Sequence, residues 1–587
     1  MELAPVDWII IAAYLLMSLG IGLYYKNQAS KSLSDFFLGG RKLPWYIAGI
    51  SMVATTFAAD TPLWVTEKVA QHGVSGNWLW WNMLIGGMLT TFFFAKLWRR
   101  AEIVTELEFV EIRYSGKPAS FLRGFKSVYM GIFLNAIVIG WVNAALASIL
   151  KVFFDIPDNQ LIYYIAAAML IVAFYATLSG LKGVAITDTV QFFIAMAGCI
   201  ILAIVVLNTD KVGGISGLKA QLPAWRFDFF PKINSGEAVE NIGTYSVTIG
   251  AFLTFSLVQW WASWYPGAEP GGGGYIAQRM MSAKDEKNAV FATLFFQIAH
   301  YCLRPWPWII VGLCALVLYP DLPIEESGQG FVMAMKDYLP AGLKGLLLVA
   351  FLSAYMSTIS TQLNWGASYL TNDLYKRFLK KTKEETEEEE QKDYVKKARL
   401  FTVLIMLVSL LATTQIKSID SAATFLIECG AGLGLVLILR WYWWRINAWS
   451  EITASLAPFI GYSIANYGLE LAYPVNFLFT VSFSTIAWLI ATFVSAPTNR
   501  EVLENFYRKV RPNGAWKPFQ HKNEEKEAML PLFICWASSI VMVYACLFFI
   551  GDLIFLNFEK AIFEAAIMVI SLIILRIQLK KTRIFDI

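Results

Sequence analysis

A run of hydroxyl side chains at helical spacing is the first feature of this sequence that could carry out chemistry. Ser357, Ser360 and Thr361 share one helix face because they are spaced i, i+3 and i+4, and Thr358 is adjacent to the first of them. Hydroxyl oxygens can bind a hard cation such as Na+ without burying a charge, if they face the free carbonyls of an interrupted helix. Ser and Thr also join membrane helices by hydrogen bonds. The spacing alone leaves both roles open.

A second polar stripe contains an arginine in an otherwise apolar segment. Gln297, His300 and Arg304 are spaced i, i+3 and i+7. A buried histidine in such a place is more often hydrogen-bonded than a proton carrier. The arginine needs a partner, which is either a structural carboxylate or a substrate carboxylate that the planar guanidinium binds at two points. The structural candidates are Glu269, Asp60 and Glu428.

Asp188 is a third candidate, because carboxylates inside apolar segments are functional candidates by default. It lies about one turn into its segment. The alternative is that it caps the helix expected to begin near Val184.

The composition shows which kind of protein must position these residues. Of 587 residues, 57% are hydrophobic and only 16% are charged, and the mean hydropathy is +0.53. Soluble domains carry about 25% charged residues. Apolar runs of about 20 residues recur along the chain, and each can cross ~30 Å of hydrocarbon. These values exclude a soluble enzyme, a nucleic-acid binder and a disordered scaffold, and they predict an all-α polytopic protein of the lipid bilayer.

Alternate loops are basic, which predicts the topology. Lys and Arg gather in every second loop, so the N-terminus is expected outside and the C-terminus inside. We expect 14 or 15 membrane spans. They lie near 7–25, 44–71, 77–98, 124–153, 160–180, 184–207, 243–278, 286–318, 341–372, 398–415, 420–440, 450–467, 474–495, 529–551 and 555–577.

Two of these segments contain helix breakers. The second carries Asp60 and Pro62, and the seventh carries Pro266, Pro270 and the run 271–274 of four glycines. The first of these could also be a plain extramembrane loop. Interrupted helices at corresponding positions of two halves indicate the binding site of a secondary transporter. Because the two segments are five apart, they predict a pair of five-helix inverted repeats.

Four further stretches, taken in order, resemble the sodium/solute symporter family. They are Asp35–Trp45, Thr105–Tyr114, Ser179–Gln191 and Ala354–Asn364, the last ending in Asn372–Lys376. The resemblance implies a leucine-transporter-like core of 5+5 helices, with one extra N-terminal helix and several C-terminal ones. The implied division is 1–30 for the extra helix, 44–207 and 243–446 for the repeats, and 447–587 for the periphery.

The resemblance also implies where sodium binds. The principal site falls on backbone carbonyls of Ala54, Phe57 and Ala354 with the hydroxyls of Ser357 and Thr358. Some members of the family have a second sodium site, which here would use Asp188 with the hydroxyls of Ser357, Ser360 and Thr361.

The resemblance places the solute between the two interrupted helices. Sugar-transporting relatives carry a tyrosine–glutamate pair near positions 79 and 80, and its loss here argues against simple glucose or galactose. Pro266–Gly274 is a further departure from the family pattern. The expected substrate contacts are Thr55, Thr56, Asp60, Thr61, Asn82, Trp260, Trp264, Tyr265, Gln297, His300, Arg304 and Glu428. The tryptophans among them have an alternative place at membrane interfaces.

The sequence therefore predicts a sodium-coupled symporter, not an enzyme, that imports a small polar organic solute by alternating access. A sugar or sugar derivative is favoured, followed by a carboxylate or amino acid. The expected location is the cell membrane, as a multi-pass protein, which is the inner membrane if the source is bacterial. The alternatives are a proton-coupled or uncoupled carrier that uses Asp60, Asp188 or His300, and a membrane sensor without transport. The oligomeric state is open.

Overall fold

A computed structural model describes residues 3–29, 31–231, 249–380, 386–416, 419–520 and 528–582. The first residues expected for the seventh segment, 243–248, lie outside these ranges. Within them the chain is almost entirely helical, which confirms the all-α fold. The boundaries of the two repeats stay a prediction.

The expected spans all coincide with helices or with runs of short helices. In the described ranges, nine helices are long and apolar enough to cross a membrane, or ten if one pair bent by 48° forms a single span. This number is smaller than the expected 14 or 15 for two reasons. Interrupted segments consist of helices that are too short one by one, and α21, although 27 residues long, carries many charged residues in its first half. The N-outside orientation stays a prediction.

The N-terminal half contains the first expected interruption. Helix α3 ends at Thr55 and α4 begins at Asp60, so residues 56–59 are unwound. Pro62 is tolerated because it lies in the first turn of α4. Ala54, Phe57 and Ala59 are at most 2% exposed, which contradicts the plain extramembrane loop. The helices of this half are α1 Pro5–Ala29, α2 Leu33–Leu38, α3 Trp45–Thr55, α4 Asp60–His72, α5 Trp78–Trp81, α6 Met83–Leu89, α7 Ala95–Ala101, α8 Glu108–Arg113, α9 Gly116–Val128, α10 Asn135–Phe154, α11 Asp158–Leu207 and α12 Gly214–Gln221.

The next helices contain the second interruption. The chain leaves its helix at Ala262 and resumes one at Gly274, and between them Gly271 and Gly272 both have φ of +77°, a backbone conformation that favours glycine. The helices are α14 Ile249–Thr254, α15 Trp260–Ala262, α16 Gly274–Ser282, α17 Glu286–Ile298, α18 Pro305–Leu318, α19 Gln329–Tyr338, α20 Leu343–Ser368, α21 Glu387–Thr413, α22 Ile419–Cys429 and α23 Leu433–Tyr442. π-helical turns at Ala299–Leu303 and Tyr369–Leu379 extend α17 and α20.

A third interruption, between α22 and α23, was missed in the sequence. It is the bent pair of 48°, and it lies beside the second interruption. The Trp264 N–H donates to the Gly430 carbonyl at 3.3 Å, and the Gly432 N–H donates to the Ala262 carbonyl at 2.8 Å. The two interrupted backbones therefore satisfy one another, as backbone in a membrane must.

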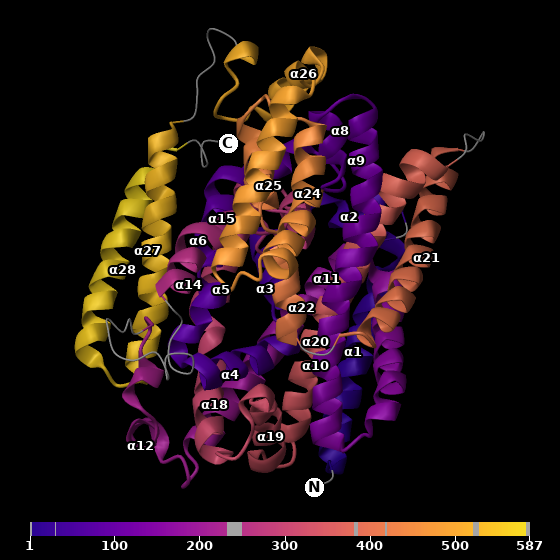
Figure 1. The fold of residues 1–587 in the computed structure, drawn as a ribbon. Coiled ribbons are helices and arrows are strands. Elements are labelled where there is room, and N and C mark those ends of the chain that lie inside the picture. The colour runs from indigo at the N-terminus through magenta and orange to yellow at the C-terminus, as the bar shows by residue number, and fades with distance from the viewer. Residues whose placement is uncertain are drawn as a thin grey trace.

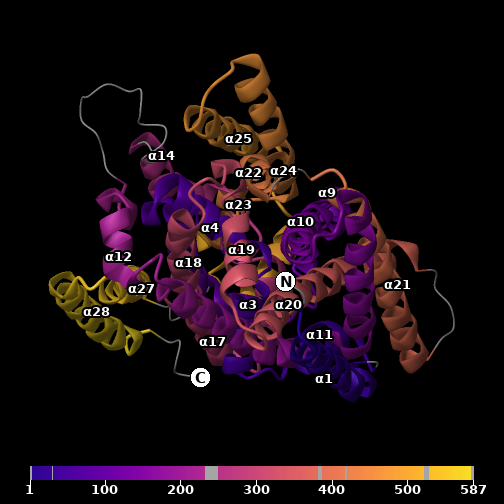
Figure 2. The same ribbon diagram turned by 90° about the horizontal axis from the view of Figure 1, so that it is seen from below.

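The remaining helices lie on the outside of the molecule. Figure 1 shows the α27–α28 hairpin at one edge, α21 at the other, and α24 with α25 in front. These helices are α24 Ala448–Ser463, α25 Val475–Val494, α26 Arg500–Val510, α27 Met529–Ile554 and α28 Phe558–Leu579. Viewed from below, α1 lies against α11, while α3 and α20 lie in the interior (Figure 2). The helix with the hydroxyl run, α20, is thus a core helix.

Candidate functional site

Helix α20 lies beside the end of α3, at the first interruption. The Thr358 hydroxyl donates to the carbonyl of Thr55 at 2.9 Å, and the hydroxyls of Thr55 and Thr361 are 3.1 Å apart. Ser357 and Thr358 are 1% and 4% exposed. The predicted principal sodium site therefore combines the C-terminal end of α3, with the carbonyls of Ala54 and Phe57, and one face of α20.

The donor groups of this site suit sodium. They are carbonyl and hydroxyl oxygens, which a hard cation prefers, and they include no nitrogen or sulfur. Ala354 is one turn before Thr358 on α20, so its carbonyl points toward the same turn. Whether these five residues bind sodium stays a prediction.

Asp188 has a different set of partners from the one expected of a helix cap. It lies eight residues after the kink at Gly180 in α11, beyond the first turn of the helix that follows. Its two carboxylate oxygens accept hydrogen bonds from Ser51 and Ser357, both at 2.6 Å. The capping alternative is therefore wrong, and Asp188 instead joins α11 to α3 and α20.

An arginine that the sequence analysis did not predict lies among the oxygens of the second candidate sodium site. The Arg279 guanidinium is 0% exposed and lies 3.7 Å from the Asp188 carboxylate. It donates to the Thr361 hydroxyl at 2.7 Å and to the Ser51 hydroxyl at 3.2 Å. A positive charge thus already occupies this set of oxygens. Only the arginine itself, in the stretch after the glycine run, could have signalled this in the sequence.

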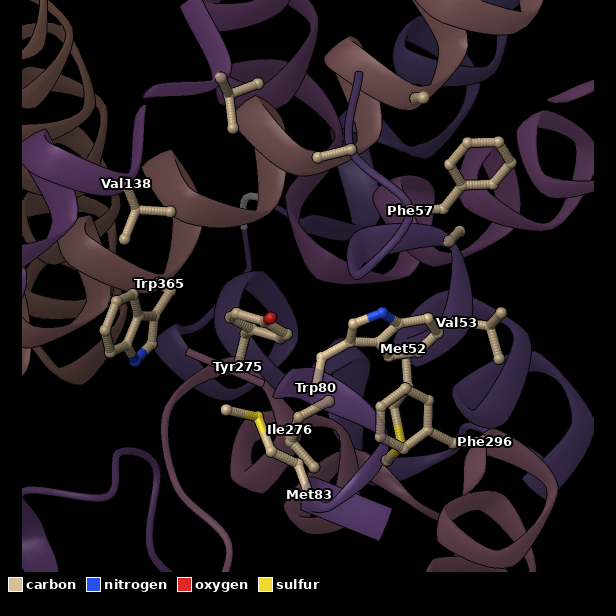
Figure 3. Close-up of a cluster of buried hydrophobic side chains, with 14 of the residues drawn as sticks. Met52, Val53, Phe57, Trp80, Met83, Val138, Tyr275, Ile276, Phe296 and Trp365 are labelled. Carbon is tan, nitrogen blue, oxygen red and sulfur yellow. The ribbon is translucent and has the colours of Figure 1, made fainter. Parts of the chain in front are cut away.

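The central cavity lies next to the interrupted α3. Its volume is about 100 Å3, small beside the ~300–1,000 Å3 of drug-sized pockets. Seven of the expected substrate contacts line it, namely Thr55, Thr56, Asp60, Thr61, Tyr265, His300 and Arg304. Figure 3 shows buried side chains of this region, with Trp80 of α5 between Tyr275 of α16 on one side and Met52 of α3 on the other.

Five expected contacts lie elsewhere, because local groups or other helices engage them. Asn82 donates to the carbonyls of Trp78 and Leu79 in the turn before it, both at 2.9 Å. Glu428 is paired with Asn476 of α25 at 3.4 Å. Neither residue lines the central cavity.

The other three are held by packing. The Trp260 ring lies against Trp536 of α27 at 6.1 Å, and Trp264 is joined to Gly430 through its backbone. Gln297 packs over Gly87, where a Cβ would come within 2.1 Å of the glutamine Oε1 atom. Of the predicted stripe, His300 and Arg304 line the cavity and Gln297 does not. The reason is the π-helical turn from Ala299 to Leu303, which rotates Gln297 onto a different helix face from Arg304.

Further aromatic residues complete the cavity. Trp80 stacks on Tyr301 with ring centroids 5.7 Å apart, and Trp141 stacks on Tyr265 at 6.3 Å. Further lining residues are Trp64, Tyr275 and Gln362. Trp141 and Tyr301 are single aromatic residues in membrane helices, and their spacing gave no signal, whereas Gln362 lies within one of the stretches that carry the family resemblance.

His300 is hydrogen-bonded through both ring nitrogens. Its Nε2 atom lies 3.3 Å from an Arg304 nitrogen, which can only donate, so the ring proton is on Nδ1 and faces the Thr56 hydroxyl at 3.0 Å. This arrangement matches the satisfied buried histidine. Arg304 itself forms no ion pair with Glu269, Asp60 or Glu428 in the described part of the chain.

Comparisons with known proteins point to a single family of membrane transporters. The model of the sodium:solute symporter family matches residues 36–458. The chain is 23% identical to a sodium/glucose cotransporter of Vibrio parahaemolyticus, over 85% of this chain and 91% of that one. It is 25% identical to a sodium/sialic acid symporter of Proteus mirabilis, over 84% and 95%. It is 24% identical to a sodium/proline symporter of Staphylococcus aureus, over 82% and 85%. The fold resembles a solved outward-open sodium-coupled sialic acid symporter with a TM-score of 0.64, 21% identity, and coverage of 85% and 100%.

Proposed function

The chain belongs to the sodium:solute symporter family, and on that premise we propose where its sodium ion and its solute bind. Sodium is the coupling ion, and the protein is a multi-pass membrane transporter rather than an enzyme. We place sodium at Ala54, Phe57, Ala354, Ser357 and Thr358, and a small polar organic solute in the central cavity.

The observation that carries this proposal is a shared boundary between the two sites. Thr55 and Thr358, which are joined by a 2.9 Å hydrogen bond, both line the central cavity. A sodium ion held by Thr358 would therefore fix one wall of the solute site. Each ligand then favours binding of the other by the same factor, as linkage requires.

Two features support an outward-facing arrangement. A larger cavity of about 550 Å3, bordered by Lys151, Asp158 and Glu325, shares Trp64 with the central cavity. At the predicted cytoplasmic side, Glu451 is paired with Arg440 and Lys126 in a buried cluster. Entry from outside past Trp64, with the cluster closing the inside, is the first half of an alternating-access cycle.

The solute class follows from the charged residues of the cavity. Aromatic rings and threonines could accept a sugar. Arg304 and Asp60, however, line the cavity without an ion-pair partner in the described residues, and a neutral sugar would leave both charges without one. We therefore rank a carboxylate or amino acid before a sugar.

The proposal is tested by the thermal stability of the purified protein against a panel of amino acids, carboxylates and sugars, in sodium and again in potassium. A ligand that binds only the folded state raises the free energy of unfolding by RT ln(1 + [L]/Kd), so the rise in melting temperature at a fixed ligand concentration reports the affinity. We expect a solute that stabilises in sodium and at least ~10-fold less effectively in potassium, the range of ordinary coupling energies. Equal stabilisation in both salts would contradict the proposed coupling.

We further propose that one sodium ion moves per cycle. Arg279 supplies the positive charge that a second ion would bring to Asp188 and Thr361. Sodium activation of solute uptake into proteoliposomes should then have a Hill coefficient of about one, since the coefficient cannot exceed the number of sites. A coefficient clearly above one would contradict this proposal. It would indicate that a second sodium ion binds at Asp188 and that the Arg279 guanidinium moves away to admit it.

A further inference from the structure

Arg304 is a buried positive charge with unused hydrogen-bond donors. It is 1% exposed, and its Nη1 nitrogen donates to the Val53 carbonyl at 3.2 Å and to the Thr56 hydroxyl at 3.0 Å. Its Nη2 nitrogen faces His300. A guanidinium has five N–H donors, and Nε has no partner. The Nε–H and one Nη2 hydrogen therefore remain, which are the two donors that bind a carboxylate side by side.

Other buried arginines show how this protein usually neutralises such a charge. Arg279 is paired with Asp188, and Arg440 is paired with Glu106 and Glu451. Arg113 has no ion pair in the described residues, but its guanidinium donates to three carbonyls and does not line the central cavity. Arg304 therefore differs from these arginines: it has no ion pair in the described residues, and it lines the central cavity.

Asp60 is the opposite charge in the same cavity wall. It is the first residue of α4, and its Oδ1 atom is buried without a hydrogen-bond partner. In the described chain it forms no ion pair, with Arg304 or with any other base. The cavity therefore contains one positive and one negative group that are not paired with each other.

We propose that the solute is a small zwitterion whose carboxylate binds Arg304 and whose ammonium group binds Asp60; this rests on the symport function proposed above. Such a solute gives each buried charge a partner and adds no net charge. A simple carboxylate would leave Asp60 uncompensated, and uncompensated charges in a dry site are costly. The faces of Trp80 and Trp141 can cover the carbon skeleton and attract its cationic end.

The test compares solutes that differ only in charge. The purified full-length protein, in sodium, is titrated with the twenty standard L-amino acids, β-alanine and glycine betaine, and stabilisation is measured by thermal unfolding. The best zwitterion is then compared with its deaminated acid and with its amide, and a set of hexoses serves as the neutral class. Each single-charge analogue should bind about 10- to 100-fold more weakly, the value of one charge-assisted contact.

Variants assign each charge to its residue. Asp60→Asn should lower the affinity for the zwitterion and spare the deaminated acid, whereas Arg304→Gln should lower both. Asp210→Asn and Arg500→Gln make the same substitutions at exposed residues outside both cavities and should leave both affinities unchanged. Because Arg304 also contacts the α3 end, its glutamine variant could fail to fold. In that case the Asp60→Asn variant alone tests the inference, through its affinity for the zwitterion relative to the deaminated acid.

The outcomes separate this inference from the symport function. Stabilisation by hexoses or simple carboxylates but by no zwitterion overturns the inference, and sodium dependence of those solutes would still support symport. An Asp60→Asn variant that weakens the zwitterion and the deaminated acid equally also overturns it. If no solute stabilises and sodium has no effect, the proposed function itself fails.

Discussion

Replacing Ser357 and Thr358 together by alanine should weaken the apparent sodium affinity of solute uptake by about 10- to 100-fold, the usual cost of disturbing a metal site. The physical reason is that the two hydroxyls are the side-chain ligands of the proposed site, and backbone carbonyls alone cannot replace them. Because solute and sodium binding are linked, the solute affinity measured at low sodium should fall as well. Sodium titration of uptake into proteoliposomes measures both effects.

The same helix provides a matched control. The buried Ser368 donates to the carbonyl of Trp365 at 2.6 Å, eleven residues beyond Ser357. Ser368→Ala removes a hydroxyl of the same kind and should leave the sodium affinity unchanged. The double variant also removes the hydrogen bond from Ser357 to Asp188. If its sodium affinity were nevertheless unchanged, the two hydroxyls would only link helices, which is the alternative that their spacing left open.

Glu451→Ala should lower the free energy of unfolding by about 3–5 kcal/mol, the cost of breaking a buried ion pair from one side. The Glu451 side chain is 0% exposed, and it accepts hydrogen bonds from Lys126, from Arg440 at 3.0 Å and from the Tyr114 hydroxyl at 2.8 Å. Removing it leaves two buried cations without their shared partner. Thermal unfolding of the purified variant, in parallel with its folded yield, measures the loss.

An exposed glutamate gives the contrast. Glu504 pairs with Arg500 at 2.8 Å on α26, where the side chains are 43% and 77% exposed. Its alanine variant should cost about 0–1 kcal/mol, since water screens such pairs. Similar melting temperatures for the two variants would show that the Glu451 cluster does not hold the protein together at its predicted cytoplasmic side.

This cluster also explains how distant parts of the chain are joined. Lys126 is on α9, Arg440 on α23 and Glu451 on α24, and Arg440 reaches Glu106 in the loop before α8 at 3.2 Å. The two predicted repeats and the first peripheral helix thus meet at one group of charges. In the alternating-access cycle proposed above, these ion pairs are the contacts that we expect to separate when the protein opens toward the cytoplasm.

The helices, two of the interruptions and the family could all be predicted from the order of residues along the chain. These depend on local properties: apolar runs set the length of a span, and Pro62 or the glycine run 271–274 breaks a helix wherever the tertiary fold places it. The hydroxyl run on α20 was readable because its spacing puts the oxygens on one face. The four stretches that resemble the family were readable in the same direct way.

Most contacts between distant side chains, by contrast, followed from how the helices pack and could not be predicted. Arg279 lies more than 80 residues from Asp188 in sequence, and no periodicity relates the two. Gln297 was expected beside Arg304 in the cavity, but a π-helical turn between them changes the facing, and turns of that kind leave no clear sequence pattern. Glu428 and Asn82 found partners in neighbouring helices or in their own turn. Helix formation depends on neighbours in the chain, whereas a binding site depends on the packing of helices that are distant in sequence. Arg304 and Asp60 were both expected at the solute site, but only the packing shows that they line one cavity without an ion pair between them.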